Sequence, residues 1–289
     1  MKKVIIVGSL NTDLVINAPY APQGGETLMG SDFMINQGGK GANQAYAVAS
    51  LGGNAYMCGC VGDDSFGTDS TQNLNKIGVN TDFVRRVNGA PTGVAVIVVT
   101  NGENRIIIDS GANGHLTKSD IDGVLEIANE GDIYLTQLEN PIDVIGYGLK
   151  QAKEKGLLTV LNPAPANCDI LKYAEYVDII TPNETESAIL GGKEALFGYG
   201  IKTVITTLGS AGYEIATQGG AKTYPCIKIT PVDTTAAGDT ACGGLCAMLS
   251  RGKSLEDAMA YGSKAASIAC TRPGAQKSVP TKEQVEQYK

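Results

Sequence analysis

The segment 232–241, with the sequence VDTTAAGDTA, carries the residue types that phosphoryl transfer requires. Small residues at 236–238 let backbone N–H groups approach an anion closely, and a helix beginning there adds positive partial charge. Asp239 lies in the first turn of the helical pattern that continues over 241–250, where it can accept the proton of an attacking hydroxyl. A helix-capping carboxylate has the same local sequence, so this segment alone leaves both interpretations open.

Two further segments carry polar residues beside glycines. In the run NQGGKGANQA at 36–45, the glycines precede a helical pattern and permit close approach of a ligand to the backbone. Lys40 and Asn43 then offer donors suited to hydroxyl groups. Asp13 follows the first predicted strand, where an open parallel sheet binds ligands, and could accept two adjacent sugar hydroxyls. Taken alone, Asp13 favours a turn-forming Asx residue over this role. The run at 38–41 lacks the pattern of a Walker P-loop.

Composition excludes several classes of protein. The chain has 289 residues, a net charge of −7 and a pI near 4.9, which argues against nucleic acid or an anionic membrane as partner. No apolar run has the length of a membrane-spanning helix, and the start of the chain does not resemble a signal peptide. The seven cysteines are scattered, which favours free, buried thiols in a reducing cytoplasm. The single His115 follows a Gly-rich stretch and is expected in a loop.

Strand-like and helical patterns alternate along the chain. The strand-like runs are 3–7, 55–60, 133–135, 158–161, 177–180 and 203–206. The helical patterns are 41–51, 66–77, 118–128, 142–155, 240–250 and 254–271. Such alternation predicts an α/β fold in which helices cover both faces of a mostly parallel sheet. We expect one domain over 1–289.

Two segments, 14–36 and 91–109, interrupt this alternation, because they contain strand-like stretches and turns without an intervening helix. Asn101 and Gly102 form a hairpin signal in the second. We interpret these segments as a small β-sheet that projects from the core as a lid over a substrate. Its open edge or face favours pairing with a second subunit, which predicts a homodimer.

The ordered set of motifs resembles the ribokinase, or phosphofructokinase-B, family of sugar kinases, essentially from end to end. Its two signatures are GGKGANQA at 38–45 and DTTAAGDT at 233–240. Further similarities are the N-x-x-E run at 183–186, TLGSAG at 207–212, and TRPGAQ at 271–276. The resemblance implies a three-layer α/β/α core with a projecting β lid, and ATP-dependent phosphorylation of a sugar.

The resemblance also implies roles for individual residues. Asp239 would be the general base, and the N–H groups of Ala236, Ala237 and Gly238 would form the anion hole. The sugar-binding positions would be Asn11, Asp13, Gly39, Lys40, Asn43, Glu139 and Asp239. The nucleotide-binding positions would be Asn183, Thr207, Gly209, Ser210, Gly212, Gly238 and Ser263.

The resemblance implies two metal ions. Glu186, with Asn183, would organise Mg²⁺ through water. The alternative is that Asn183 is a helix cap and Glu186 an exposed helical acid. A K⁺ site would comprise Asp233, Thr235, Ala269, Arg272, Gly274 and Ser278. The alternative there is a turn held by ordinary hydrogen bonds.

The sequence departs from the family pattern at three places, two of which affect the nucleotide side and the third the packing behind Asp239. The stretch 187–200 is shorter than is typical, Ser263 replaces a frequent His or Asn, and Ala-Cys-Gly at 241–243 replaces Phe-Asn-Gly. As the substrate, the resemblance favours D-ribose, phosphorylated at its 5-hydroxyl. Fructose, 2-deoxyribose or a nucleoside such as adenosine remain alternatives. A non-catalytic binding protein would be expected to lack the base, and a dinucleotide oxidoreductase would be expected to carry GxGxxG.

Overall fold

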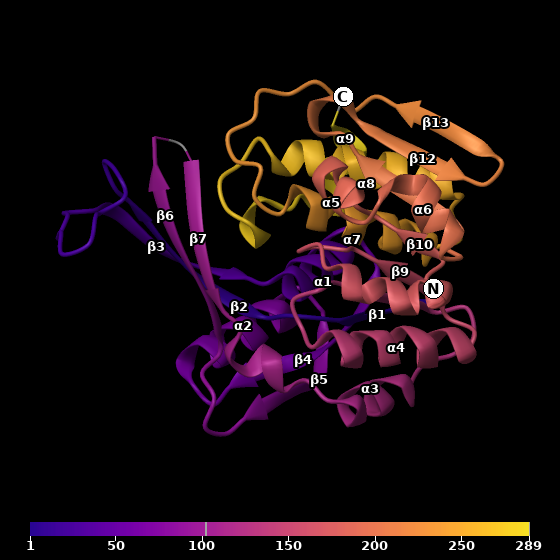
Figure 1. The fold of residues 1–289 in the computed structure, drawn as a ribbon, viewed down its shortest axis with the longest axis horizontal. Coiled ribbons are helices and arrows are strands. Elements are labelled where there is room, and N and C mark those ends of the chain that lie inside the picture. Colours follow the sequence, from indigo (N-terminus) through magenta and orange to yellow (C-terminus); the bar gives the residue numbers. More distant parts are fainter. Residues whose placement is uncertain (102, 289) are drawn as a thin grey trace.

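The computed structural model describes residues 1–101 and 103–288, and its centre is a nine-stranded sheet (Figure 1). The strand order is β13-β12-β11-β10-β9-β8-β1-β4-β5. In this order, the seven strands that run from β11 across to β5 pair in parallel with their neighbours. At the other edge, β12 and β13 add an antiparallel hairpin. Their bounds are Lys3–Val7 (β1), Asn54–Gly62 (β4), Asn80–Val87 (β5), Ile133–Thr136 (β8), Leu158–Leu161 (β9), Ile179–Ile180 (β10), Thr203–Thr207 (β11), Tyr213–Thr217 (β12) and Gly220–Tyr224 (β13).

Helices cover both faces of this sheet. They are α1 (Lys40–Ser50), α2 (Ser65–Lys76), α3 (Lys118–Leu125), α4 (Ile142–Glu154), α5 (Glu184–Ile189), α6 (Gly192–Gly198), α7 (Ala237–Leu249), α8 (Leu255–Ala269) and α9 (Lys282–Gln287), with 3-10 turns η1 (Gly111–His115), η2 (Cys168–Tyr176), η3 (Gly209–Ala211) and η4 (Gln276–Ser278). Val4 and Ile6 of β1 pack in one core with α1, α7 and α8, whereas Ile5 and Val7 pack in another with α3 and α4. Because successive strand residues point to opposite faces, this split defines three layers.

A second sheet, the lid, projects from the core and lies at the left of Figure 1. Its order is β3-β2-β6-β7, with β2 at Asn11–Asn17, β3 at Ser31–Gly38, β6 at Gly93–Thr100 and β7 at Glu103–Asp109. The expected lid segments contain most of these strands, although β2 begins before residue 14 and β3 ends after residue 36. Asp13 therefore lies in a strand, opposite Asn36 and Ala95, and the Asx-turn interpretation is wrong. The predicted hairpin turn includes Gly102, which lies outside the described residues.

Several elements differ from the sequence-based prediction. The pattern did not predict β5, the β12–β13 hairpin, α5 or α6. The helices α5 and α6 are short, and β5 carries both Arg85 and Arg86. Hydrophobic periodicity is therefore weak in all three elements. The helix predicted from residue 240 begins at Ala237, and the one predicted to residue 271 ends at Ala269. His115 ends η1 rather than lying in an open loop.

The cysteines are free, as expected, but not all of them are buried. Cys168 is exposed because it begins η2 at the surface, and Cys226 is partly exposed. Among residues 1–101 and 103–288, none of the helices combines the length and the apolar character needed to cross a bilayer.

Candidate functional site

Asp239 lies at the N-terminal end of α7, where its carboxylate is almost fully buried. The side chain is 6% exposed and makes no capping hydrogen bond to its own helix. Instead, Asn43 Nδ2 donates to Asp239 Oδ2 at 3.1 Å and Gln44 Nε2 donates to Oδ1 at 2.9 Å. The capping interpretation is therefore wrong for Asp239, because α1 rather than the first turn of α7 holds its carboxylate.

The turn before Asp239 has the geometry expected of an anion hole. Ala236 is the residue before α7 and adopts a left-handed conformation, with φ of 58° and ψ of 17°. Ala237 and Gly238 then begin the helix. The Ala237 N–H donates to the Thr234 carbonyl at 3.2 Å, whereas the Gly238 N–H has no partner one turn earlier within α7. Anions bind well at such a helix start because the unpaired donors and the helix dipole act together.

Lys40 balances the negative charge of the site. Burial lowers the pKa of the Lys40 ammonium, but the negative charges of Asp239, Glu139 and Glu186 together raise it by a larger amount. The net pKa therefore lies above its ordinary value. Burial raises the pKa of Asp239, whereas Lys40 and the two amide donors oppose that rise. The net pKa of Asp239 is raised, which suits a carboxylate that must accept a proton.

Asp13 lies beside this group at the base of the lid. Gly38 of β3 makes room for it, since a Cβ at Gly38 would lie 2.4 Å from the Asp13 carboxylate oxygens. Burial, followed by the fields of Glu139 and Asp239, raises the pKa of Asp13 to about 7. The structure thus brings the predicted sugar-side carboxylates together, at the ends of strands from two different sheets.

Glu139 caps α1 from another part of the chain. Gly39 precedes the helix with φ of 85° and has no side chain to act as a cap. The Lys40 N–H donates to Glu139 Oε2 at 3.0 Å, and the Ser9 hydroxyl donates to the same oxygen. Glu139 therefore fixes the start of α1 against the end of β1, in addition to any contact with a ligand.

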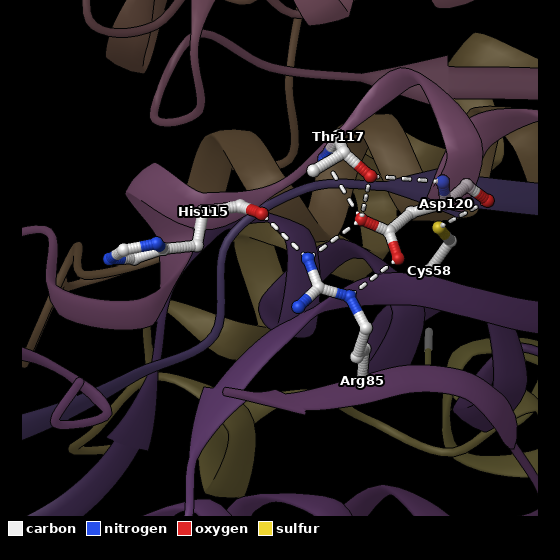
Figure 2. Close-up of polar contacts among 5 residues, drawn as sticks. All are labelled: Cys58, Arg85, His115, Thr117 and Asp120. Carbon is white, nitrogen blue, oxygen red and sulfur yellow. Dashed lines mark hydrogen bonds and ion pairs between the residues drawn. The ribbon is translucent and has the colours of Figure 1, made fainter. Parts of the chain in front are cut away.

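Asn11 is held by η1, which itself is clamped to the core. Asn113 Nδ2 donates to Asn11 Oδ1 at 2.7 Å. Figure 2 shows how the turn is fixed: Arg85 of β5 donates to the His115 carbonyl and forms a two-pronged ion pair with Asp120. This clamp fixes the position of η1, and η1 in turn fixes the position of Asn11.

Two adjoining cavities open around the start of α7. The smaller, of about 240 Å³, is lined by Lys40, Asn183, Glu186, Asp239 and the 236–238 turn, among others. The larger, of about 550 Å³, contains most of the predicted nucleotide residues. These are Thr207, Gly209, Ser210, Gly212, Gly238 and Ser263. Thr207, Ala237 and Gly238 line both cavities, so a ligand could extend from one into the other. Asn183 lies on the smaller cavity instead.

Asn183 and Glu186 form a capping box at the start of α5. The Glu186 N–H donates to Asn183 Oδ1 at 2.8 Å, and the Asn183 N–H donates to Glu186 Oε2 at 2.9 Å. This local geometry is that of the alternative interpretation, a helix cap. The same carboxylate also faces the smaller cavity, where its negative charge raises the pKa of Lys40. The cap and a metal-organising role are therefore compatible.

Asp233 joins the 233–235 turn to the tail of the chain. Its carboxylate accepts from the N–H groups of Thr235 at 2.9 Å and Gly274 at 2.8 Å. Burial raises the pKa of Asp233, but these hydrogen bonds outweigh it and hold the pKa below its usual value. Arg272 N–H donates to the Ala269 carbonyl, and the Ser278 hydroxyl donates to the Ala275 carbonyl. Of the predicted K⁺ residues, these hydrogen bonds join Asp233, Thr235 and Gly274, whereas the bonds of Ala269, Arg272 and Ser278 are local to the tail segment.

Sequence reasoning missed several polar residues of the site. Gln44 contacts Asp239 directly, and Gln137 and Gln276 hydrogen-bond to Gln44 and Asn43 respectively. A signal for Gln44 was present, because it stands four residues after Lys40 and one after Asn43, on the same helical face. Nothing in the local sequence around Gln137 or Gln276 indicates their contacts, since they come from distant segments.

The fold and the site together define a kinase class, and comparison with known proteins agrees. The family described as pfkB family carbohydrate kinase matches residues 1–282. A ribokinase of Haemophilus influenzae is 37% identical over 300 residues, covering 99% of this chain and 98% of its own.

Two solved structures are similar throughout. The ribokinase of Thermotoga maritima has a TM-score of 0.88 and 36% identity, covering 99% of this chain and 98% of its own. The ribokinase of Arabidopsis thaliana, solved with ribose and ATP, has a TM-score of 0.88 and 30% identity, covering 100% of this chain and 99% of its own. This chain belongs to the pfkB family of carbohydrate kinases, so the expected family, fold and kinase activity are confirmed.

Proposed function

We propose that this protein transfers the γ-phosphoryl group of ATP to the 5-hydroxyl of D-ribose. The observation that carries the proposal is the buried Asp239 carboxylate, which two amides of α1 hold on the smaller cavity, near Asp13 and Glu139. The similarity to ribokinases over nearly the whole chain supports ribose as the sugar.

On the sugar side, the chain's own groups bind and orient the hydroxyls. Asp13 and Asn11 lie at the base of the lid, and Lys40, Asn43 and Gly39 come from the start of α1. Asp239 takes the proton of the attacking hydroxyl, since its raised pKa makes it a better base than an ordinary aspartate. Glu139 keeps the start of α1 in place for these contacts.

On the nucleotide side, the larger cavity receives ATP and the turn at 236–238 receives the migrating group. The N–H groups of Ala237 and Gly238 stabilise the charge on the phosphoryl oxygens, and such preorganised donors usually contribute several kcal/mol. Ser210 and Gly212 of the 207–212 loop and Ser263 of α8 line the space left for the base and the ribose of ATP.

Glu186 and Asn183 would hold Mg²⁺. The fit rests on the donor set of the smaller cavity, where the Glu186 carboxylate and Asn183 share the lining with the 236–238 turn. Mg²⁺ commonly keeps several waters and binds through one or two carboxylates and substrate phosphates, which it neutralises. Glu186 supplies one carboxylate on the smaller cavity, beside the anion hole.

The residues near Asp233 would hold K⁺. The Asp233 carboxylate and the carbonyl-rich segment 269–278 lie together, as the hydrogen bond from Gly274 shows, and such an oxygen donor set suits a weakly hydrated cation. A cation there would offset the charge of Asp233 and stiffen the turn that leads to Ala236.

The lid would pair two subunits in the cytoplasm. Its strands expose apolar side chains, including Phe33, Ile35, Ile106, Ile107 and Ile108, which are 49–74% exposed. An exposed apolar patch of this kind on a small sheet favours burial against a second copy. Light scattering at micromolar concentration should give the mass of a dimer, and a monomer with full activity would contradict this assembly.

A coupled assay of ADP release tests the substrate and the cations. The panel consists of D-ribose, 2-deoxyribose, D-fructose, adenosine and fructose 6-phosphate, each with Mg-ATP and with or without K⁺. We expect ribose to have the highest kcat/KM and K⁺ to increase it. A different preferred sugar would refute the specificity, and turnover of none of them would refute the proposed function.

A further inference from the structure

Two lines of buried amide side chains end on the carboxylate of Asp239. We call them the amide relay: Asn73, Gln276 and Asn43 on one side, and Gln137 and Gln44 on the other. The amides of this relay come from α2, η4, α1 and the segment after β8, which are far apart in sequence. Four of the five are almost fully buried, with exposures of 0–7%.

The first line begins near the surface and runs inward. Asn73 Nδ2 donates to Gln276 Oε1 at 2.6 Å, and Gln276 Nε2 donates to Asn43 Oδ1 at 3.2 Å. An amide has a donor end and an acceptor end, so these bonds orient each group in turn. Asn43 is thereby left with its Nδ2 facing Asp239 Oδ2.

The second line reaches the other carboxylate oxygen. Gln137 Nε2 donates to Gln44 Oε1 at 2.6 Å, which directs Gln44 Nε2 toward Asp239 Oδ1 at 2.9 Å. The same nitrogen also lies 3.3 Å from Asn162 Oδ1. Both lines therefore present donors to a carboxylate that, when ionised, only accepts hydrogen bonds.

The direction of these bonds matters because Asp239 is buried. Burial favours the protonated acid, as do the neighbouring carboxylates of Glu139 and Asp13, while the Lys40 ammonium and the donated N–H groups favour the ionised form. If Asn43 lost its partner Gln276, its amide could turn and place an oxygen against the Asp239 carboxylate. The donor would then be replaced by a repulsive contact.

We propose that Gln276 and Gln137 are positioning residues, which act through Asn43 and Gln44 to keep Asp239 oriented and ionised. The kinetic consequence rests on the proposed role of Asp239 as general base. The same tail also contacts Asp233 through Gly274, so one segment orients both the base and the turn of the anion hole.

The test is a titration of the Asp239 carboxyl carbon by ¹³C NMR in the protein without substrates. Its resonance is assigned by its loss in Asp239→Asn and followed from about pH 4 to about pH 9 in wild type, Gln276→Met and Gln137→Met. Gln287→Met, at an exposed position of α9, is the matched control. Asn43→Ala and Asn43→Ala/Gln276→Met complete a double-mutant cycle.

We expect the Asp239 midpoint to rise by about one pH unit in Gln276→Met and in Gln137→Met, a tenfold change in its acid dissociation constant. In the cycle, Gln276→Met should add nothing to Asn43→Ala. At saturating substrates, kcat should be reduced more at acidic than at alkaline pH, which a purely structural defect would not produce.

A midpoint equal to that of wild type in both single variants would overturn the proposal, and so would an equal shift in Gln287→Met. Should Gln276→Met fail to fold, Asn73→Leu tests the same line from its least buried member, with the same expected direction. The titration does not depend on turnover. Failure to phosphorylate ribose would therefore refute the proposed function while leaving this result readable.

Discussion

Replacing Asp13 by asparagine should make the protein more stable at alkaline pH while it impairs sugar binding. The Asp13 carboxylate lies at the base of the lid, and burial together with Glu139 and Asp239 raises its pKa from 3.8 to about 7. An ionised Asp13 is therefore a cost to the folded state that only a ligand can offset.

The size and the pH range follow from this pKa. A shift from 3.8 to about 7 is roughly three units, or about 4 kcal/mol at 1.36 kcal/mol per unit, an upper value since water reaches part of the side chain. Below the unfolded pKa, Asp13 is protonated in both states and costs nothing. As pH rises from 3.8 to about 7, the unfolded chain gives up the proton that the folded protein keeps, so stability falls over this range and the full cost is present above about pH 7.

Calorimetry without ligands measures the effect directly. At about pH 8 the Tm of Asp13→Asn should exceed that of wild type by several degrees, at most roughly 7 °C, and at about pH 4 the two should nearly coincide. Asp69→Asn, on the exposed face of α2, is the matched control and should change neither value. KM for the sugar should rise in Asp13→Asn. An Asp13→Asn protein that is less stable than wild type at the alkaline pH would refute the reasoning.

Three other substitutions probe separate parts of the site. Ala236→Gly should raise the free energy of unfolding by about 1 kcal/mol in thermal unfolding, because the backbone of Ala236 adopts a left-handed conformation that is costly for a residue with a Cβ. A lower Tm would contradict this. Arg85→Met should cost about 1–3 kcal/mol in urea unfolding, because it leaves the His115 carbonyl without its donor and the Asp120 carboxylate with only its hydrogen bonds from Thr117; an unchanged midpoint would show that the clamp is dispensable. Glu186→Gln keeps a capping-box residue but should raise the Mg²⁺ concentration for half-maximal rate about tenfold, and an unchanged requirement would exclude Glu186 from the metal site.

Much of the core could be predicted from the sequence because its signals are local. The apolar run at 3–7 is a buried strand and the small-residue turn before Asp239 is a helix start, as expected. The alternation of such elements was sufficient for a parallel sheet with helices on both faces. The edge strand β5 was missed because Arg85 and Arg86 interrupt its apolar pattern while forming contacts with other elements.

The site was predictable where its residues share a motif and not where they meet through the fold. Lys40, Asn43 and Asp239 belong to two short runs, whereas Gln137 and Gln276 reach the same group from separate segments. The state of Asp13 was equally hidden, since its raised pKa depends on burial in the fold and on Glu139 and Asp239, which lie more than 100 residues away along the chain.

The measurement that tests the central claim most directly is the rate of phosphoryl transfer by Asp239→Asn in rapid-quench experiments with ribose and Mg-ATP. Asn preserves the shape and one acceptor but cannot take the proton, so the rate should fall by about 10²–10⁴-fold while the affinity for ATP changes little. Asp257→Asn, at the equivalent but exposed position of α8, is the matched control and should remain fully active. A loss of less than about tenfold in Asp239→Asn would contradict the assignment of this carboxylate as the general base.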